Sequence, residues 1–82
     1  MPMIAIVDGV KILMFYNDHA PPHFHAVIGD DEVLISIRDL GTLEGTLPPA
    51  KLRRVLSWAR DHQGALALNW IKCQDEQQPD RI

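Results

Sequence analysis

The chain has 82 residues, of which 46% are apolar and 23% charged, a composition typical of a single soluble globular domain. Its one cysteine excludes an intramolecular disulfide, and no apolar run approaches the roughly 20 residues of a membrane-spanning helix. The N-terminal MPMIAIVDG lacks the basic residues and the cleavage site of a secretory signal. We therefore expect a cytoplasmic protein that does not act at a membrane.

The charge of the chain argues against a dedicated nucleic-acid-binding domain, because the formal net charge is −3. The basic residues are unevenly spread, however, and residues 51–60 contain Lys51, Arg53, Arg54 and Arg60 without any acid. A basic helix face of this kind usually contacts only solvent and binds no partner. Nucleic acid is therefore kept as a minor candidate partner.

The first two predicted strands form a hairpin. Residues 3–7 and 10–16 are rich in β-branched and aromatic residues, and Asp8-Gly9 separates them. Asp-Gly between two such runs is a strong signal for a two-residue hairpin turn. Both faces of the second run are largely apolar, which predicts a central or covered strand.

A second hairpin is predicted for residues 24–28 and 33–37, around Gly29-Asp30-Asp31. Either choice of two-residue turn places the same polar side chains on one face of the sheet. These are His23, His25, Ser36 and Arg38. The opposite face carries the better apolar row and should face the core, so His23 and His25 are expected on the open face.

The C-terminal half predicts two helices. Residues 41–46 have the composition of a loop, with a short extended piece at Leu43. Pro49 suits the first turn of a helix that runs to about Gln63, and Gly64 separates it from a second helix over residues 65–74. Residues 75–82 are polar and predict a disordered tail outside a single domain of residues 1–74.

The predicted fold is therefore α+β. It consists of a small antiparallel sheet of about four strands, arranged as two hairpins, followed by two C-terminal helices packed on one face.

The segment NDHAPPHFH, residues 17–25, contains three of the four histidines and is called the histidine segment below. His23 and His25 lie two residues apart on a strand, so their rings point the same way, and His19 can reach them through the Pro-Pro bend. Three imidazoles, with Asp18 as a fourth or outer ligand, suit a divalent metal such as zinc. Asn, Asp and a double proline also make a structural turn, so both interpretations stay open.

Two histidines can also work without a metal, as general acid and general base. His23 and His25, with Arg38 to hold a phosphate, would suit a small ribonuclease. The sequence contains neither a nucleophile elbow nor a glycine-rich phosphate loop.

A second candidate surface lies on the first predicted helix. Trp58 falls at the edge of its buried stripe, and tryptophan beside arginine is typical of an interface hot spot. Its neighbours on the helix surface are Lys51, Arg54 and His62. The alternative is that Trp58 only packs on the sheet as a core aromatic residue.

Several motifs together resemble one small bacterial family, the domain of unknown function 4160. They are N-D-H-x-P-P-H-F-H, ISI at residues 35–37, LEGTLPP at residues 43–49, and a helix with Leu52, Leu56 and Trp58. The resemblance covers about residues 2–72. The hallmark positions of the family correspond to Asn17, Asp18, His19, Pro21, Pro22, His23, Phe24, His25, Glu44 and Gly45.

The resemblance implies a short, stand-alone, cytoplasmic bacterial protein without an established activity. Such proteins are often encoded beside a small protein of domain of unknown function 2442, in an arrangement like that of toxin–antitoxin pairs. We therefore expect one component of such a two-gene module, which binds that partner and uses the histidine segment as its functional surface. The alternatives are a metal-assisted hydrolase or histidine-based ribonuclease, and a structural homodimer that pairs through its exposed sheet.

Overall fold

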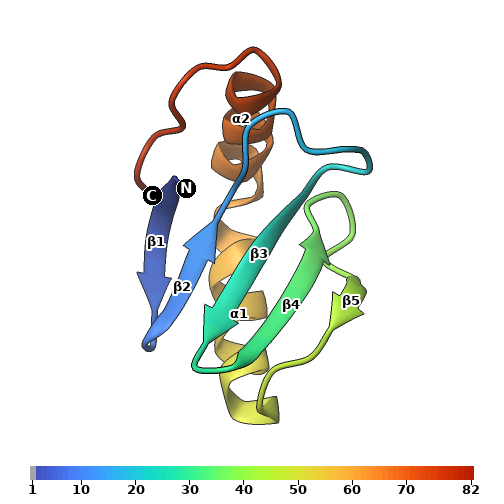
Figure 1. Ribbon diagram of the computed structural model, residues 1–82. Helices are drawn as coiled ribbons and strands as arrows, with labels where there is room; N and C mark the ends of the chain where they lie inside the picture. The colour runs from blue at the N-terminus through green and yellow to red at the C-terminus, as the bar shows by residue number, and fades with distance from the viewer. Residues whose placement is uncertain (1) are drawn as a thin grey trace.

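Residues 2–82, described by a computed structural model, form an antiparallel sheet with two helices against one face (Figure 1). The strands are β1 (Met3–Val7), β2 (Val10–Leu13), β3 (His23–Ile28), β4 (Asp31–Ser36) and β5 (Thr42–Gly45). They lie side by side in chain order, and α1 (Pro49–Asp61) and α2 (Gln63–Gln74) follow. The predicted α+β fold is confirmed, with a fifth strand where the sequence predicts a loop.

Both predicted hairpins are present. Val7 pairs with Val10 across Asp8-Gly9, and these two turn residues have φ angles of 49° and 81°. Positive φ at both positions is the geometry of the hairpin turn that Asp-Gly favours. Ile28 pairs with Asp31, so Gly29-Asp30 is the turn of the second hairpin.

The register of the second hairpin places His23 opposite Ser36 and His25 opposite Leu34. β4 ends at Ser36, because the chain reverses there: the Leu40 amide donates to the Ser36 carbonyl, and the Ser36 amide donates to the Gly41 carbonyl. Arg38 therefore lies in a turn, and not on the sheet face where strand alternation predicts it.

The core lies between the sheet and the helices. Fully buried strand residues include Phe24, Ala26 and Ile35, and α1 and α2 bury Val55 and Leu66 against them. His23 and His25 alternate with Phe24 and Ala26, so they project from the other face, which we call the open face. With 13 and 12 residues, neither helix of the described chain is long and apolar enough to cross a membrane.

The C-terminal segment, residues 75–82, lies along the domain, although its polar composition predicts a disordered tail. The Asn69 side chain exchanges two hydrogen bonds of 2.9 Å with the backbone of Asp80. The Ile82 amide donates to the Ile4 carbonyl at 2.8 Å, so the two ends of the chain lie side by side (Figure 1).

Close approach of β5 to β4 depends on Gly45. This residue has a φ of 79°, and a Cβ atom there would collide with the backbone carbonyl of Glu32. Glycine alone meets both conditions without strain. The pairing places Glu44 opposite Leu34, on the same face as His25.

We expect Gly45→Ala to lower the free energy of unfolding by at least about 2 kcal/mol, because it adds left-handed strain and a backbone collision. Urea denaturation followed by circular dichroism measures the change. The matched control is Gly64→Ala in α2, where a Cβ atom meets nothing within 4 Å. That variant should be unchanged or gain up to about 1 kcal/mol. Equal effects of the two variants would contradict this role of Gly45.

Candidate metal centre at Asp18, His23 and His25

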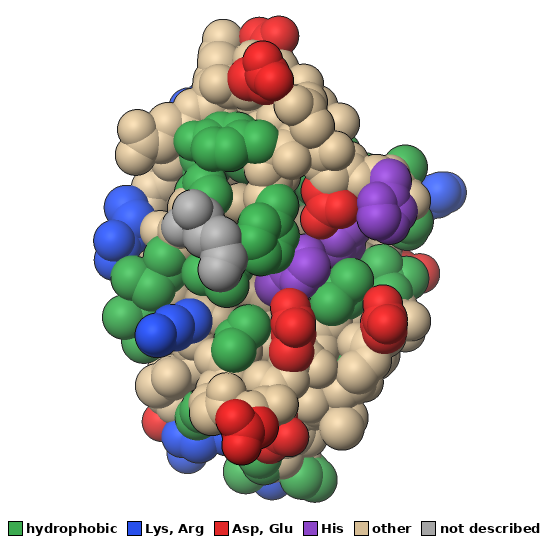
Figure 2. Space-filling view, viewed as in Figure 1, with side chains coloured by type: hydrophobic (Ala, Val, Ile, Leu, Met, Phe, Trp, Pro, Cys, Tyr) green, Lys and Arg blue, Asp and Glu red, His purple; other side chains and the backbone are tan. Residues whose placement is uncertain are grey.

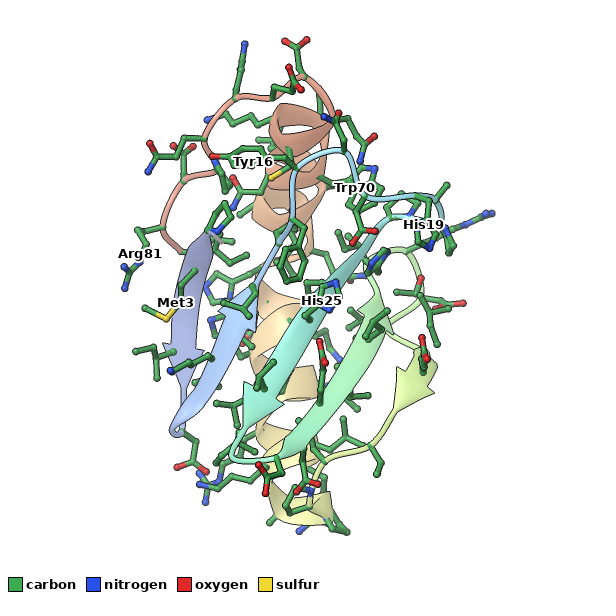
Figure 3. All side chains as sticks on the ribbon, viewed as in Figure 1. Met3, Tyr16, His19, His25, Trp70 and Arg81 are labelled. Atoms are coloured by element: carbon green, nitrogen blue, oxygen red, sulfur yellow. The ribbon has the colours of Figure 1, made fainter. Side chains whose placement is uncertain are left out.

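Three side chains of the histidine segment converge at one end of β3. His23 and His25 come from the strand, and Asp18 comes from the loop between β2 and β3. His25 projects from β3 toward the viewer in Figure 3. In Figure 2 the histidine side chains gather on one side of the open face, among acidic and apolar groups.

The geometry of the three groups suits a single metal ion. Oδ2 of Asp18 lies 2.9 Å from Nε2 of His23 and 3.2 Å from Nε2 of His25, and one ligand atom from each residue lies within 4.8 Å of the others. Ligands placed 2.0–2.1 Å from a tetrahedral zinc ion are about 3.3 Å apart. The 3.2 Å separation is close to that value, and the 2.9 Å separation is somewhat shorter.

The partners of the other ring nitrogens determine which tautomer each histidine adopts. Nδ1 of His23 lies 2.7 Å from the Pro21 carbonyl oxygen, and Nδ1 of His25 lies 2.8 Å from Oε2 of Glu32. A carbonyl and an ionised carboxylate can only accept, so both Nδ1 atoms carry hydrogen. In each neutral ring Nε2 therefore presents a lone pair to Asp18.

Neutral histidines would thus direct two lone pairs at an ionised carboxylate, which is repulsive unless a cation lies between them. One solution, in metal-free protein, is a proton on Nε2 of one or both rings, which makes the contacts of 2.9 and 3.2 Å to Oδ2 of Asp18 hydrogen bonds. The other solution is one metal ion bound by all three atoms. The Pro21 carbonyl and Glu32, which accept from the Nδ1 atoms, then act as the outer partners that usually orient metal-binding histidines.

The carboxyl group of Asp18 is held in its ionised form. Burial acts to raise its pKa, but in the state with a proton on Nε2 of the rings, hydrogen bonds from His25 and from the His19 amide, together with the charge interaction with His23, lower the pKa below its ordinary value of 3.8. An ionised carboxylate is the form that binds metal.

Aromatic rings enclose the two histidines. Phe15 meets His25 edge-on at a centroid distance of 4.4 Å, and Trp70 of α2 lies 5.2 Å from the His23 ring (Figure 3). The His23 side chain is consequently only 4% exposed, although the strand pattern predicts an open-face position. His25 is 13% exposed, so solvent reaches the centre from the His25 side.

His19, predicted as a third imidazole ligand, is not part of this cluster. Its side chain is 94% exposed, and its Nδ1 lies 3.4 Å from Oδ1 of Asp18, the oxygen that does not face the other rings. Its backbone amide donates to the same Oδ1 at 2.9 Å and so helps to orient the carboxylate.

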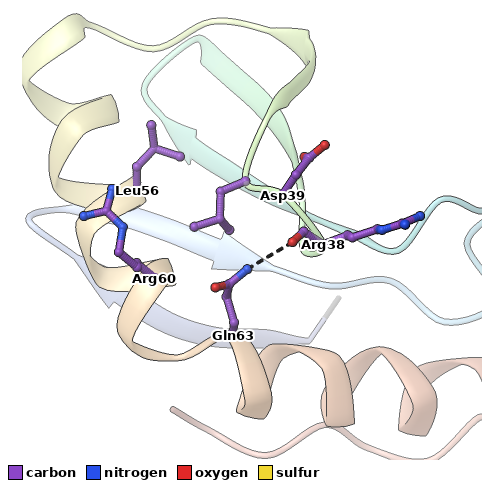
Figure 4. A pocket seen from close by; sticks show the side chains of 6 residues that line it. Arg38, Asp39, Leu56, Arg60 and Gln63 are labelled. Carbon is purple, nitrogen blue, oxygen red and sulfur yellow. Dashed lines mark hydrogen bonds between the residues drawn. The ribbon is translucent and has the colours of Figure 1, made fainter.

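Arg38, predicted to hold a phosphate beside the histidines, makes no ion pair with any described residue. Its backbone carbonyl accepts a hydrogen bond from Gln63 at the edge of a cavity lined also by Leu56 and Arg60, and its side chain points away from that cavity (Figure 4). The structure does not join Arg38 to the centre.

Glu32 is a functional candidate that sequence reasoning missed. It faces Val27, which lies two residues after His25 and on the same side of β3, so the Gly29-Asp30 turn places Glu32 next to His25. The hairpin register contains this signal. A shallow groove lined by His25, Glu32, Leu34, Glu44 and Gly45 continues from the centre across the open face.

The second predicted surface, on α1, is largely engaged within the fold. Lys51 and Arg54 both pair with Asp8 of the first hairpin, at 3.2 and 3.1 Å. Trp58 packs edge-on against the core residue Phe24 and stacks on His62. This arrangement agrees with the alternative in which Trp58 packs on the sheet.

The lowered pKa of Asp18 predicts how stability depends on pH in metal-free protein. A carboxylate with a lower pKa in the folded state stabilises the fold fully above the unfolded value of about 3.9 and loses this contribution as the pH falls further. The difference in unfolding free energy between wild type and Asp18→Asn should therefore shrink as the pH falls from about 5 to about 3. Urea titrations across this range measure it, and a difference that grows in acid would contradict the assignment.

Comparison with known protein families gives one match, which spans residues 9–71, most of the chain. No curated protein and no solved structure matches the chain. The matched region contains all three residues of the centre, Glu32, and the glycine that brings β5 against β4. The chain belongs to the family described as domain of unknown function (DUF4160).

Proposed function

We propose that the protein binds one divalent transition-metal ion through Asp18, His23 and His25 and that this centre catalyses a hydrolytic reaction. The observation that supports the proposal is the convergence of three ligand atoms. Nδ1 of each ring faces a protein acceptor, which leaves Nε2 of each ring available, and one ligand atom each of Asp18, His23 and His25 lies within 4.8 Å of the other two.

The donor set favours a catalytic over a purely structural metal site. Three protein ligands leave at least one position for water or substrate, as in catalytic zinc sites, and two histidines with one carboxylate also serve non-haem iron(II). A divalent metal with an open position supplies Lewis-acid activation of water or of a substrate carbonyl or phosphoryl group.

The surrounding residues have defined roles in this proposal. Glu32 and the Pro21 carbonyl orient the two rings, and Phe15 and Trp70 exclude water from the buried side of the centre. The groove beside His25 offers a substrate an approach along the open face.

Metal binding is tested with chelator-treated protein titrated by calorimetry with Zn²⁺, Mn²⁺ and, without oxygen, Fe²⁺. We expect one ion per chain. His23→Ala and His25→Ala should weaken binding at least about 100-fold, and Glu32→Gln about 10-fold, because the outer partner of His25 loses its charge. The matched control is His19→Ala, which removes an exposed imidazole from the same segment and should change affinity less than threefold.

Hydrolysis is then measured on ester and phosphodiester substrates with the same proteins, with and without the bound metal. Activity should require the metal and disappear in His25→Ala but not in His19→Ala. Failure of wild type to bind any of the three ions would refute the centre. Binding without metal-dependent hydrolysis would refute the catalytic role and leave a metal-binding protein.

We also propose that the protein is one component of a toxin–antitoxin-like two-gene module and that it binds the small protein encoded beside it through the open face. Ile6 is 56% exposed on this face, and Val27 and Leu34 are only partly buried near the centre. Apolar side chains exposed next to a polar site are typical of a partner-binding surface.

This second function predicts that the two proteins co-purify when expressed together. Ile6→Glu should weaken the complex at least tenfold, because it places a charge on the apolar contact. Leu68→Glu is the matched control, since Leu68 is 62% exposed but belongs to α2 on the other side of the sheet. Equal effects of the two variants would refute the open face as the surface. A homodimer that Ile6→Glu dissociates would support the self-pairing alternative instead.

A further inference from the structure

The three ligands of the proposed centre differ in how firmly the backbone that carries them is held. His23 and His25 belong to a strand that pairs on both sides, with β2 and β4. Asp18 belongs to residues 14–22, which form no helix or strand. The position of its carboxylate therefore depends on what holds this loop.

The end of α2 supplies the contacts that hold the loop next to Asp18. The Gln74 side chain donates to the Asp18 carbonyl at 2.8 Å. The Asn17 amide donates to the Cys73 carbonyl at 3.3 Å, and the Asn17 side chain donates to Oε1 of Glu76 at 2.8 Å. All of these partners lie after residue 71, where the family match ends.

The backbone at Glu76 is in a conformation that favours glycine. The Gln77 amide donates to the Lys72 carbonyl and the Glu76 amide to the Cys73 carbonyl, the pair of bonds that closes a helix through a left-handed residue. Glu76 is that residue, with a φ of 58°. A residue other than glycine is unfavourable at this position. Glutamate also lacks the local hydrogen bonding that lets asparagine tolerate the left-handed region.

Asn17, at the other end of the side-chain bond, also has a left-handed φ of 53°. A strained residue persists where its surroundings hold it in place. The side chain of Glu76 adds nothing to the closure of the helix, but it links the helix end to the residue directly before the metal ligand.

We propose that Glu76 is a positioning residue of the metal centre, and that the segment after α2 controls metal affinity by holding Asp18 against the two histidines. This inference rests on the proposed function, because it concerns the same centre. Further contacts hold the segment itself: Lys72 pairs with Asp80, and the buried Asn69 binds the Asp80 backbone.

Glu76→Gly separates positioning from a merely structural role, because the two predict opposite changes. Glycine relieves the left-handed strain, so the melting temperature of the metal-free protein should stay the same or rise. The link to Asn17 is lost, so the dissociation constant for Zn²⁺ should increase about tenfold, as for other outer partners of a metal site. Glu76→Gln keeps an acceptor oxygen and should restore most of the affinity.

The matched control is Gln77→Ala, because the Gln77 side chain donates its hydrogen bond to Asp75 and none to the loop that carries Asp18. Its affinity for Zn²⁺ should equal that of wild type. A Glu76→Gly variant that binds Zn²⁺ as tightly as wild type would overturn the proposal. So would a loss of affinity accompanied by an equal loss in the Gln77→Ala variant or by a fall in melting temperature.

A metal-free measurement distinguishes failure of this inference from failure of the proposed function. The His19 amide donates to Oδ1 of Asp18, so its hydrogen exchange reports the order of the carboxylate. Exchange should be faster in Glu76→Gly than in wild type and unchanged in Gln77→Ala. Unchanged exchange in Glu76→Gly overturns the positioning role whether or not metal binds. Faster exchange in a protein that binds no metal supports the positioning of Asp18 and refutes the metal centre alone.

Discussion

The arrangement at one end of β3 depends on a single electrostatic constraint. An ionised carboxylate faces Nε2 of two imidazole rings, and the Nδ1 atom of each ring already donates to another acceptor. Such a set is stable only with positive charge at its centre. The fold provides this constraint from three directions. A strand fixes the spacing of His23 and His25, a hairpin brings Glu32 to one ring, and a loop tied to α2 brings Asp18 between them.

The sheet contributes more than a support for the histidines. Because one slipped residue would turn every side chain of a strand to the other face, the register of the second hairpin keeps the apolar rows of β3 and β4 on one face and their polar rows on the other. Gly45 then allows β5 to approach closely enough for Glu44 to join the groove beside His25. The apolar core and the polar open face are thus two results of one register.

Strand alternation was enough to predict the side of the sheet that carries His23 and His25, and together with the helix pattern it predicted the fold class. It left two registers of the second hairpin open, and the structure has the one with the Gly29-Asp30 turn. It missed β5, because all four residues from Thr42 to Gly45 are exposed and show no buried alternation. It also missed the burial of His23, which Trp70 covers from an element 47 positions further along the chain. Contacts between distant parts of the chain leave no local pattern.

Contacts between distant parts of the chain also explain why the local sequence does not predict the positions of Asp18 and of the C-terminal segment. Residues 75–82 have the composition of a tail, yet one buried side chain, Asn69, pairs with the backbone of Asp80 as another strand would. Nothing in the local sequence distinguishes an asparagine that holds a distant segment from one that is solvated. The position of Asp18 depends on Gln74, 56 residues away, for a similar reason.

The hydrogen bond between Ile82 and Ile4 affects β1, one of the two edge strands of the sheet. Outer strands expose unpaired backbone groups that can recruit strands from other chains, and proteins protect them by covering or shortening them. Here the C-terminus occupies part of the β1 edge, while β5 at the opposite edge is short and carries Glu44. Because both edges are protected, addition of a strand from another chain is disfavoured. The open face of the sheet is then the surface that remains for binding another molecule.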